Sequence, residues 1–462
     1  METVDFHPDF VKRVQGDPFL GTSLLEALNE HVPVSVRRNP QKMEAELPTS
    51  HIIDWCEGGF YLTERPSFTL DPLFHAGSYY PQEAGSMVID TVLRQLEIPE
   101  APTALDLCGS PGGKSTLVLS YLNNTGVLVS NEVIQSRAKI LKENCTKWGY
   151  ANSVVTNNDP SDFARLPNFF DVMLVDAPCS GEGMFRKDPA ARSEWSEDNV
   201  KLCAARQKRI LGDVWSSLKP GGYLIYSTCT FNENENEQNV QWIQEELGAE
   251  IISVKMPAEF QSGRENIGHY AFPGKVDAEG FYIAILRKNG DPLSLRRGVV
   301  SGTTSPFGGG QRGRTKTKSN SIHKEKDLSL LTDFVNLNEI SVWRWKDYFL
   351  GIPANIEETM LTIQNHMRIV KLGTQLGMLA RKGFVPSHDL SMSVSLRKVY
   401  KSNELNREEA LKYLKGETFA LTGDRGMQLV TYNDEPLGWI KHLGNRFNNG
   451  YPKEWRIKMK LN

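Results

Sequence analysis

The chain has 462 residues, six cysteines and a formal net charge of −3, from 53 Lys and Arg against 56 Asp and Glu. This length supports two to four domains with an ample core. Six cysteines are too sparse for a disulfide framework in so long a chain, and no apolar run reaches eighteen residues. Because no leader of charged, apolar and small residues begins the chain, we expect a soluble cytoplasmic protein.

Short apolar runs between residues 103 and 286 are separated by segments of helix length. The expected strands are 103–107, 126–130, 153–156, 170–175, 222–227 and 281–286, and the expected helices are 115–122, 135–148, 199–218 and 235–247. Runs that are apolar on both faces are typical of parallel strands with helices on each side. The pattern therefore predicts an α/β fold built from βαβ units.

A glycine-rich turn follows the first of these runs. It consists of Cys108, Gly109, Ser110, Pro111, Gly112, Gly113 and Lys114, and it leads into a helix. Such a turn lets the backbone approach a ligand closely. A P-loop would need its first glycine at position 108, where a cysteine stands, and no G-x-G-x-x-G pattern is present. The turn therefore indicates a cofactor without a triphosphate.

Acidic residues follow the next two runs. Glu132 lies about twenty residues beyond the turn, where an acidic side chain can accept hydrogen bonds from both hydroxyls of a ribose. Asp159 follows the third run, where a carboxylate or its backbone can meet an adenine edge. A solvated loop acid is the alternative for either residue taken alone. Together with the glycine turn, these residues describe a nucleoside cofactor without phosphates, and S-adenosylmethionine fits that description.

Two cysteines also come directly after apolar runs. Cys179 lies in the segment 176–181 (DAPCSG), and Cys229 lies in the segment 227–231 (STCTF). Ligands bind at strand ends in open α/β sheets, so thiols at these positions indicate chemistry. A zinc site is the alternative, but no C-x-x-C pair occurs and the histidines show no ligand spacing. We therefore predict no metal.

These motifs resemble those of a known enzyme family. The segments 108–115, 176–181 and 227–231 are similar to the cofactor loop and the two cysteine motifs of the NOL1/NOP2/Sun family of RNA 5-methylcytosine methyltransferases, in the same order. Residues 75–87 and 279–281 resemble segments that open and close that catalytic domain. The resemblance implies a Rossmann-like class I methyltransferase sheet and S-adenosylmethionine as the cofactor.

The chemistry of cytosine methylation requires a nucleophile. C5 of cytosine is too weak a nucleophile to attack a methyl sulfonium, but a thiolate that adds at C6 gives C5 the character of a carbanion. We expect Cys229 to be this thiolate. The resemblance assigns proton sharing at N3 to Asp176, beside the cofactor, and product release to Cys179. Arg186 and Lys187 could hold an RNA phosphate or the target base, or they could form a solvated basic loop.

Beyond the catalytic domain the composition changes. Residues 287–326 contain ten Lys and Arg against two Asp and Glu, with Gly, Ser and Thr between them. This composition predicts a flexible basic linker, which is either a solvated tether or a contact to RNA phosphates. Further on we expect a helix over 406–414 and strands over 418–421, 427–432 and 437–441, joined by a turn at Asn433 and Asp434.

The end of the chain, by resemblance, is a PUA-like β-rich RNA-binding module. Its basic residues Lys441, Lys453 and Arg456 are candidate RNA contacts. Phe447, Tyr451 and Trp455 either stack on unpaired bases or form the core of a small barrel. We predict an N-terminal substrate-positioning region, a catalytic domain, the linker, a connecting region and this module, over 1–75, 76–288, 289–326, 327–389 and 390–462.

The chain's ending resembles that of the bacterial branch of the family that acts on 16S ribosomal RNA. We therefore expect ribosomal RNA, naked or within the small ribosomal subunit, as the substrate of a monomeric enzyme. The same reaction on transfer RNA is one alternative. The other is a non-catalytic RNA-binding assembly factor, and the presence of both Cys179 and Cys229 argues against it, because a binding protein needs neither thiol.

Overall fold

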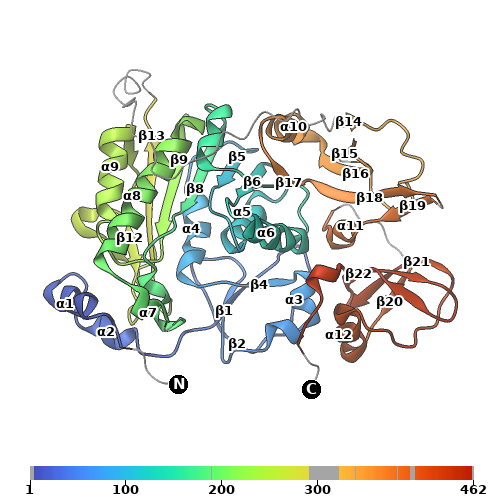
Figure 1. Ribbon diagram of the computed structural model, residues 1–462, viewed down its shortest axis with the longest axis horizontal. Helices are drawn as coiled ribbons and strands as arrows, with labels where there is room; N and C mark the ends of the chain where they lie inside the picture. The colour runs from blue at the N-terminus through green and yellow to red at the C-terminus, as the bar shows by residue number, and fades with distance from the viewer. Residues whose placement is uncertain are drawn as a thin grey trace.

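The computed structural model describes residues 5–188, 190–290, 322–338, 340–381, 383–395 and 401–459. A large mixed sheet lies at its centre, with a small N-terminal sheet along one side and two C-terminal sheets beside it (Figure 1). Most of the predicted basic linker, 289–326, lies outside the described residues. None of the described helices is long and apolar enough to cross a membrane.

The central sheet has the strand order β11-β12-β13-β9-β8-β5-β6-β7-β17, and β10 also pairs with β13. Its parallel core consists of β5 (Thr103–Asp106), β6 (Val127–Asn131), β7 (Ser153–Thr156), β8 (Phe170–Asp176) and β9 (Leu218–Thr228). The antiparallel strands beyond β9 are β13 (Phe281–Lys288), β12 (His269–Ala271), β11 (Gln261–Ser262) and β10 (Ala249–Ile251). The predicted α/β class and Rossmann-like sheet are confirmed.

Alternate residues of the parallel strands face two different cores. Met173 packs among apolar residues of α8 and α9, whereas Leu174 packs among those of α4, α5 and α6. Helices on both faces explain why these strands are apolar throughout. The helices of this domain are α4 (Ile89–Leu93), α5 (Gly113–Leu122), α6 (Gln135–Trp148), α7 (Ala190–Glu194), α8 (Glu197–Val214) and α9 (Glu237–Leu247).

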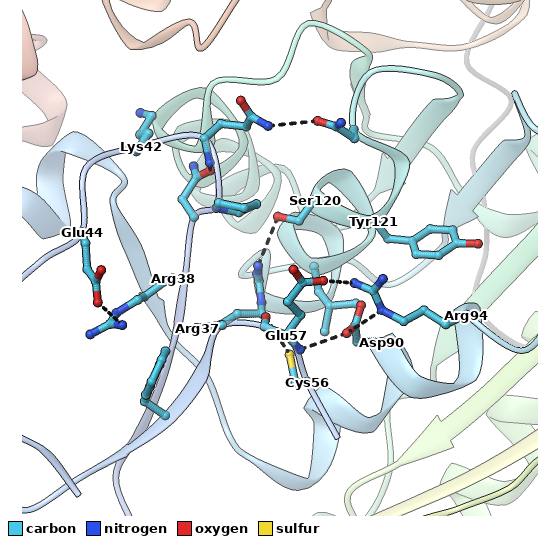
Figure 2. Close-up of a pocket in the computed structure, with 17 residues that line it drawn as sticks. Arg37, Arg38, Lys42, Glu44, Cys56, Glu57, Asp90, Arg94, Ser120 and Tyr121 are labelled. Carbon is cyan, nitrogen blue, oxygen red and sulfur yellow. Dashed lines mark hydrogen bonds and ion pairs between the residues drawn. The ribbon is translucent and has the colours of Figure 1, made fainter. Parts of the chain in front are cut away.

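The N-terminal sheet is antiparallel, in the order β2-β3-β1-β4, and it lies against helix α5. Its buried Arg37 donates from Nη2 to the Gly113 carbonyl (3.2 Å) and to Thr116 Oγ1 (2.6 Å). Figure 2 shows the same guanidinium beside Ser120. The sheet is thereby tied to the helix that follows the glycine turn. The elements are α1 (Pro8–Gly16), α2 (Ser23–Ala27), β1 (Ser35–Arg38), β2 (Thr49–Ile52), β3 (Gly59–Leu62), α3 (Pro72–Ala76) and β4 (Tyr79–Pro81).

The connecting region contributes a strand to the central sheet, which the sequence does not predict. Strand β17 (Ile369–Leu372) pairs antiparallel with β7 and covers that edge of the sheet. The other strands of this region and β14, which lies at the end of the predicted linker and pairs with β15, form a five-stranded sheet in the order β14-β15-β16-β18-β19. Its elements are β14 (His323–Lys324), β15 (Ile340–Trp345), β16 (Tyr348–Pro353), α10 (Glu357–His366), β18 (Thr374–Ala380), β19 (Gly383–Pro386) and α11 (His388–Met392).

The last module is a four-stranded sheet in the order β20-β21-β22-β23, beside helix α12. The predicted helix is confirmed as α12, and the last two predicted strands are confirmed as β21 and β22. The predicted turn between these strands is also confirmed, and its residues Asn433 and Asp434 both have positive φ. The predicted strand over 418–421 is wrong, because Phe419 packs on Phe447 without any ladder hydrogen bonds. The elements are β20 (Ser402–Glu404), α12 (Arg407–Lys415), β21 (Gly426–Tyr432), β22 (Glu435–His442) and β23 (Phe447–Asn449).

This module is docked on the connecting region and on the N-terminal region of the chain. Trp439 Nε1 donates to the Ser387 carbonyl (2.8 Å), and Tyr451 OH lies 3.4 Å from His75 Nδ1. Phe447 and Tyr451 are buried in the module's core, so they are unavailable for stacking on RNA bases. For Phe447 and Tyr451 the packing interpretation is therefore correct, whereas Trp455 is only partly buried. The docking places the module beside residues 75–87, which lead into the catalytic domain.

Candidate active site

The two cysteine motifs meet at the carboxyl ends of β8 and β9. These strands are parallel neighbours, with Asp176 opposite Ser227, so the loops that leave them lie side by side. Cys179 Sγ and Cys229 Sγ are 3.1 Å apart, and both are free thiols. Residues fifty positions apart in the chain thus form one pair of thiols at the ligand-binding edge of the sheet.

The contact between the thiols also changes the acidity of Cys179. The pKa of Cys179 is raised, first by its hydrogen bond with Cys229 and second by burial. Either sulfur can donate in this contact, so a proton can be shared between the two thiols.

An ion pair flanks Cys229. Asp176 Oδ2 accepts from Lys114 Nζ (2.9 Å), and Asp176 Oδ1 accepts from Ser227 Oγ (2.9 Å). Burial alone would lower the pKa of Lys114, but the adjacent Asp176 carboxylate raises that pKa above its usual value. Lys114 is therefore a fixed cation, and it connects the glycine turn to the first cysteine motif.

A single cavity joins the glycine turn to Cys229. All residues of the turn except Gly112 line it, together with Asp106, Asp176, Lys187 and Cys229. Gly112 lies at the start of α5 with a φ of 125°, a conformation that favours glycine. A Cβ atom at Gly109 would lie 2.8 Å from Ser115 Oγ, so a larger residue there would require the Ser115 side chain to shift. The backbone of the turn can therefore approach a ligand closely.

The charges around the cavity suit a cationic ligand. Asp106 is fully buried; its Oδ2 accepts from Ser115 Oγ (2.6 Å), and its Oδ1 has no hydrogen-bond partner among the described residues. Burial raises the pKa of Asp106 to about 7. The carboxylates of Asp176, Glu83 and Glu279 also line the cavity. S-adenosylmethionine carries a sulfonium and an ammonium group, and such groups fit a cavity with an unpaired carboxylate oxygen and several further acids.

Glu132 and Asp159 lie at strand ends but do not line this cavity. Glu132 Oε1 accepts from the backbone N–H of Ile134 (2.9 Å), and its Oε2 lies 3.4 Å from Arg137 Nε. Asp159 Oδ1 accepts from the backbone N–H of Ser161 (3.1 Å) and caps a short 3₁₀ helix. Both carboxylates thus hold local backbone, and the alternative of a solvated loop acid does not describe Glu132, which is buried.

The predicted RNA-contact residues differ in their surroundings. Arg186 donates to the carbonyls of Ala278 (2.9 Å) and His31, which indicates a structural role. Lys187 is half exposed, lines the cavity and pairs with Glu279 (3.1 Å). Lys441 and Lys453 are exposed, whereas Arg456 is half buried against Gly416.

Sequence reasoning missed several residues of the site. Glu83 and Glu279 lie in segments that resemble family motifs, so the sequence motifs could have predicted them. Glu83 Oε1 accepts from the backbone N–H groups of Gly85 (2.7 Å) and Glu279 (3.1 Å), which ties these two segments together. Two further buried glutamates, Glu182 and Glu235, hold the cysteine loops and carried no signal of their own.

A second cavity lies at the junction of the N-terminal sheet with α4 and α5, and it is separate from the thiols (Figure 2). Two of the cations that line it form ion pairs. Arg38 contacts Glu44, and Arg94 contacts Glu57 (2.7 Å). Among the described residues no group of three or more His, Cys, Asp and Glu could hold a metal ion. The thiols and the adjoining cavity are therefore the candidate active site.

An open α/β sheet with a glycine turn, acidic side chains and a cavity at its strand ends is the architecture of an S-adenosylmethionine-dependent methyltransferase. The comparisons with known proteins agree. The family described as 16S rRNA methyltransferase RsmB/F matches residues 93–287, the N-terminal domain of 16S rRNA methyltransferase RsmF matches 8–84, and the methyltransferase RsmF PUA domain matches 400–457.

Relatives match over most of the chain. Ribosomal RNA small subunit methyltransferase F of Pectobacterium atrosepticum is 33% identical, over 87% of this chain and 83% of the relative. The chain therefore belongs to the family of ribosomal RNA small subunit methyltransferase F. Its cofactor is S-adenosylmethionine, as in the family.

Solved structures share the fold. A methyltransferase homolog protein from Pyrococcus horikoshii, 26% identical, aligns with a TM-score of 0.51 over 61% of this chain and 99% of its own. NSun6 from Pyrococcus horikoshii, solved with SFG, is 20% identical and aligns with a TM-score of 0.53 over 63% of this chain and 99% of its own. The shared part of the fold is thus more than half of this chain.

Proposed function

We propose that this protein methylates C5 of a cytosine in 16S ribosomal RNA through a covalent bond between Cys229 and C6 of the base. The observation that carries this proposal is the 3.1 Å contact between the two thiols, beside the Lys114–Asp176 pair. A methyltransferase that acts on an already nucleophilic atom needs no thiol at all, whereas methylation at C5 needs one to activate the ring and assistance to release it.

The reaction begins when the Cys229 thiolate adds at C6 and pushes electrons toward N3 and the carbonyl. Asp176 is placed beside Cys229, and we assign it to proton sharing at N3. C5 then takes the methyl group that bound S-adenosylmethionine would supply, and the broken S–CH₃ bond leaves its electron pair on sulfur, which gives neutral S-adenosylhomocysteine. A base takes the C5 proton, the C5–H electron pair forms the C5=C6 double bond, and the C6–S bond breaks to return the Cys229 thiolate. We assign assistance in this release to Cys179.

We assign cofactor binding to the turn 108–114, with Asp106 facing the cationic end of the cofactor and Glu132 its ribose. Replacement of Glu132 by alanine is expected to weaken S-adenosylmethionine binding by about 1–3 kcal/mol, because hydrogen bonds to a buried charged group are lost. Isothermal titration calorimetry measures this change. Glu143→Ala is the control, because Glu143 lies on α6 and pairs with Lys147 of the same helix. Equal affinities of Glu132→Ala and wild type would remove Glu132 from the site.

We assign RNA backbone contact in the last module to Lys441 and Lys453. Replacing either lysine with alanine is expected to weaken RNA binding and to lower the slope of log affinity against log salt concentration by about 1, since one phosphate contact is lost. Fluorescence anisotropy over a salt series measures the slope. Lys201→Ala on α8 is the matched control, because that exposed lysine lies outside the module. Unchanged slopes for both module variants would exclude this contact.

The substrate assignment is tested by methylation in vitro. Purified protein and labelled S-adenosylmethionine are mixed with 16S ribosomal RNA, with small ribosomal subunits and with transfer RNA, and the nucleosides are analysed by mass spectrometry. The proposal predicts 5-methylcytidine in the 16S RNA or in the subunits. 5-Methylcytidine in transfer RNA alone would make that RNA the substrate. Binding without methylation would identify a non-catalytic RNA-binding factor.

A further inference from the structure

Each cysteine loop is held by a buried glutamate that belongs to the other cysteine motif. Glu182 follows Cys179 by three residues, and its Oε2 accepts from the backbone N–H of Phe231, two residues beyond Cys229 (3.0 Å). In the same place the backbone N–H of Gly183 donates to the Cys229 carbonyl (2.8 Å). The loop of Cys229 is therefore anchored by the segment that carries Cys179.

The reverse contact is made by Glu235, which follows Cys229 by six residues. Its Oε2 accepts from the backbone N–H of Ser180 (3.0 Å), next to Cys179, and its Oε1 accepts from Ser180 Oγ. Ser180 Oγ also lies 2.9 Å from Thr230 Oγ1. The loop of Cys179 is therefore anchored by the segment that carries Cys229, and the two anchors are different residues.

The two glutamates differ in charge compensation. Glu182 pairs with Arg13 of helix α1 (2.6 Å) and accepts from Trp195 Nε1 (3.0 Å). Glu235 has no ion pair among the described residues and instead accepts from Gln207 Nε2 (2.8 Å). Burial raises the pKa of Glu235 to about 7. Either protonation form of Glu235 can hold Ser180, because a protonated Oε1 can donate to the serine hydroxyl while Oε2 still accepts from the backbone.

We propose that Glu182 and Glu235 are positioning residues for different steps of the reaction: Glu182 positions Cys229 for formation of the C6 bond, and Glu235 positions Cys179 for release of the product. This assignment rests on the proposed covalent mechanism. Misplacing a reacting group by about 1 Å costs about 100-fold in rate, so losing one anchor slows the step of the thiol that it holds. The other thiol keeps its own anchor.

The test measures adduct formation and product release separately, with the full-length protein, 16S RNA and S-adenosylmethionine. Glu235→Ala is expected to form the denaturant-resistant protein–RNA adduct at the wild-type rate, to release product about 100-fold more slowly and so to accumulate the adduct. Glu182→Ala is expected to form the adduct about 100-fold more slowly and not to accumulate it.

Glu235→Gln is the matched control. The amide oxygen can accept from Ser180 N–H and Gln207, and its NH₂ group faces Ser180 Oγ, which can then donate to Thr230 Oγ1. This variant is expected to release product at close to the wild-type rate. Cofactor affinity and melting temperature are measured for every variant, because a general loss of structure would change them together with both steps.

Ser180→Ala provides a second variant, since it removes only the hydroxyl contacts and is the milder change if Glu235→Ala does not fold. It is expected to accumulate adduct in the same way, to a smaller extent. The assignment would be overturned if Glu235→Ala slowed adduct formation and product release equally. It would also be overturned if Ser180→Ala accumulated no more adduct than the wild-type protein. No adduct in either Cys179→Ala or Cys229→Ala would instead overturn the covalent mechanism, and the assignment with it.

Discussion

Replacement of Cys179 by alanine is expected to trap the protein on its substrate as a denaturant-resistant adduct, while replacement of Cys229 is expected to abolish both adduct and product. The reason is that the two thiols, whose sulfur atoms are 3.1 Å apart, are assigned to different steps. Without Cys229 no bond to C6 forms. Without Cys179 the bond forms and the methyl group is transferred, but the elimination that frees Cys229 loses its assistance.

Denaturing gel electrophoresis with labelled RNA and with labelled cofactor measures this result directly. The adduct should require the correct RNA, because the target base must leave its stack to reach the thiol. The adduct should also carry the transferred methyl label. Cys203→Ala is a suitable control, because Cys203 is a buried thiol on α8. An adduct in Cys229→Ala and none in Cys179→Ala would reverse the assignment of the two roles.

Asp176→Asn is expected to lower turnover by about 10²- to 10⁴-fold, the usual contribution of a positioned acid or base. The asparagine keeps the shape of the side chain and can still accept from Ser227, but it presents an amide to Lys114 and cannot share a proton with N3 of the base. The pKa of Lys114 would fall as well, since the carboxylate that raises it is gone.

Steady-state kinetics at saturating cofactor measures the loss in turnover, and calorimetry measures cofactor binding separately. Ser227→Ala removes only the hydroxyl that donates to Asp176, so it keeps the carboxylate and its ion pair with Lys114. This control is expected to lose much less turnover than Asp176→Asn. If both variants lost equally little, Asp176 would have no part in proton sharing.

The sequence predicted the central sheet because its strands are apolar on both faces and are separated by helix-length segments. The strands β5 to β9 and β13 lie where the apolar runs lie. The edge strand β17 could not be predicted, since it lies over 200 residues beyond its partner β7 and follows several strands of another sheet. Pairing of that kind is decided by tertiary contacts and leaves no local pattern.

In the site, too, some residues are predicted by local sequence motifs and others only by tertiary contacts. The thiols, the glycine turn and Asp176 carry motifs, and their position at adjacent strand ends follows from the order of the strands. Glu182 and Glu235 act through single long-range hydrogen bonds, so no spacing rule predicts their partners. Arg186 has the charge expected of an RNA contact, but its guanidinium is occupied by backbone carbonyls, and only the structure shows that.

Bisulfite sequencing of 16S ribosomal RNA, from otherwise identical strains with and without the gene, tests the central claim most directly. Bisulfite converts cytosine and leaves 5-methylcytosine unchanged. We expect one or more cytosines that resist conversion in the strain with the gene and become convertible in its absence, with resistance restored by the wild-type gene and not by Cys229→Ala. Identical conversion patterns at every cytosine of 16S RNA in the two strains would contradict the proposed function.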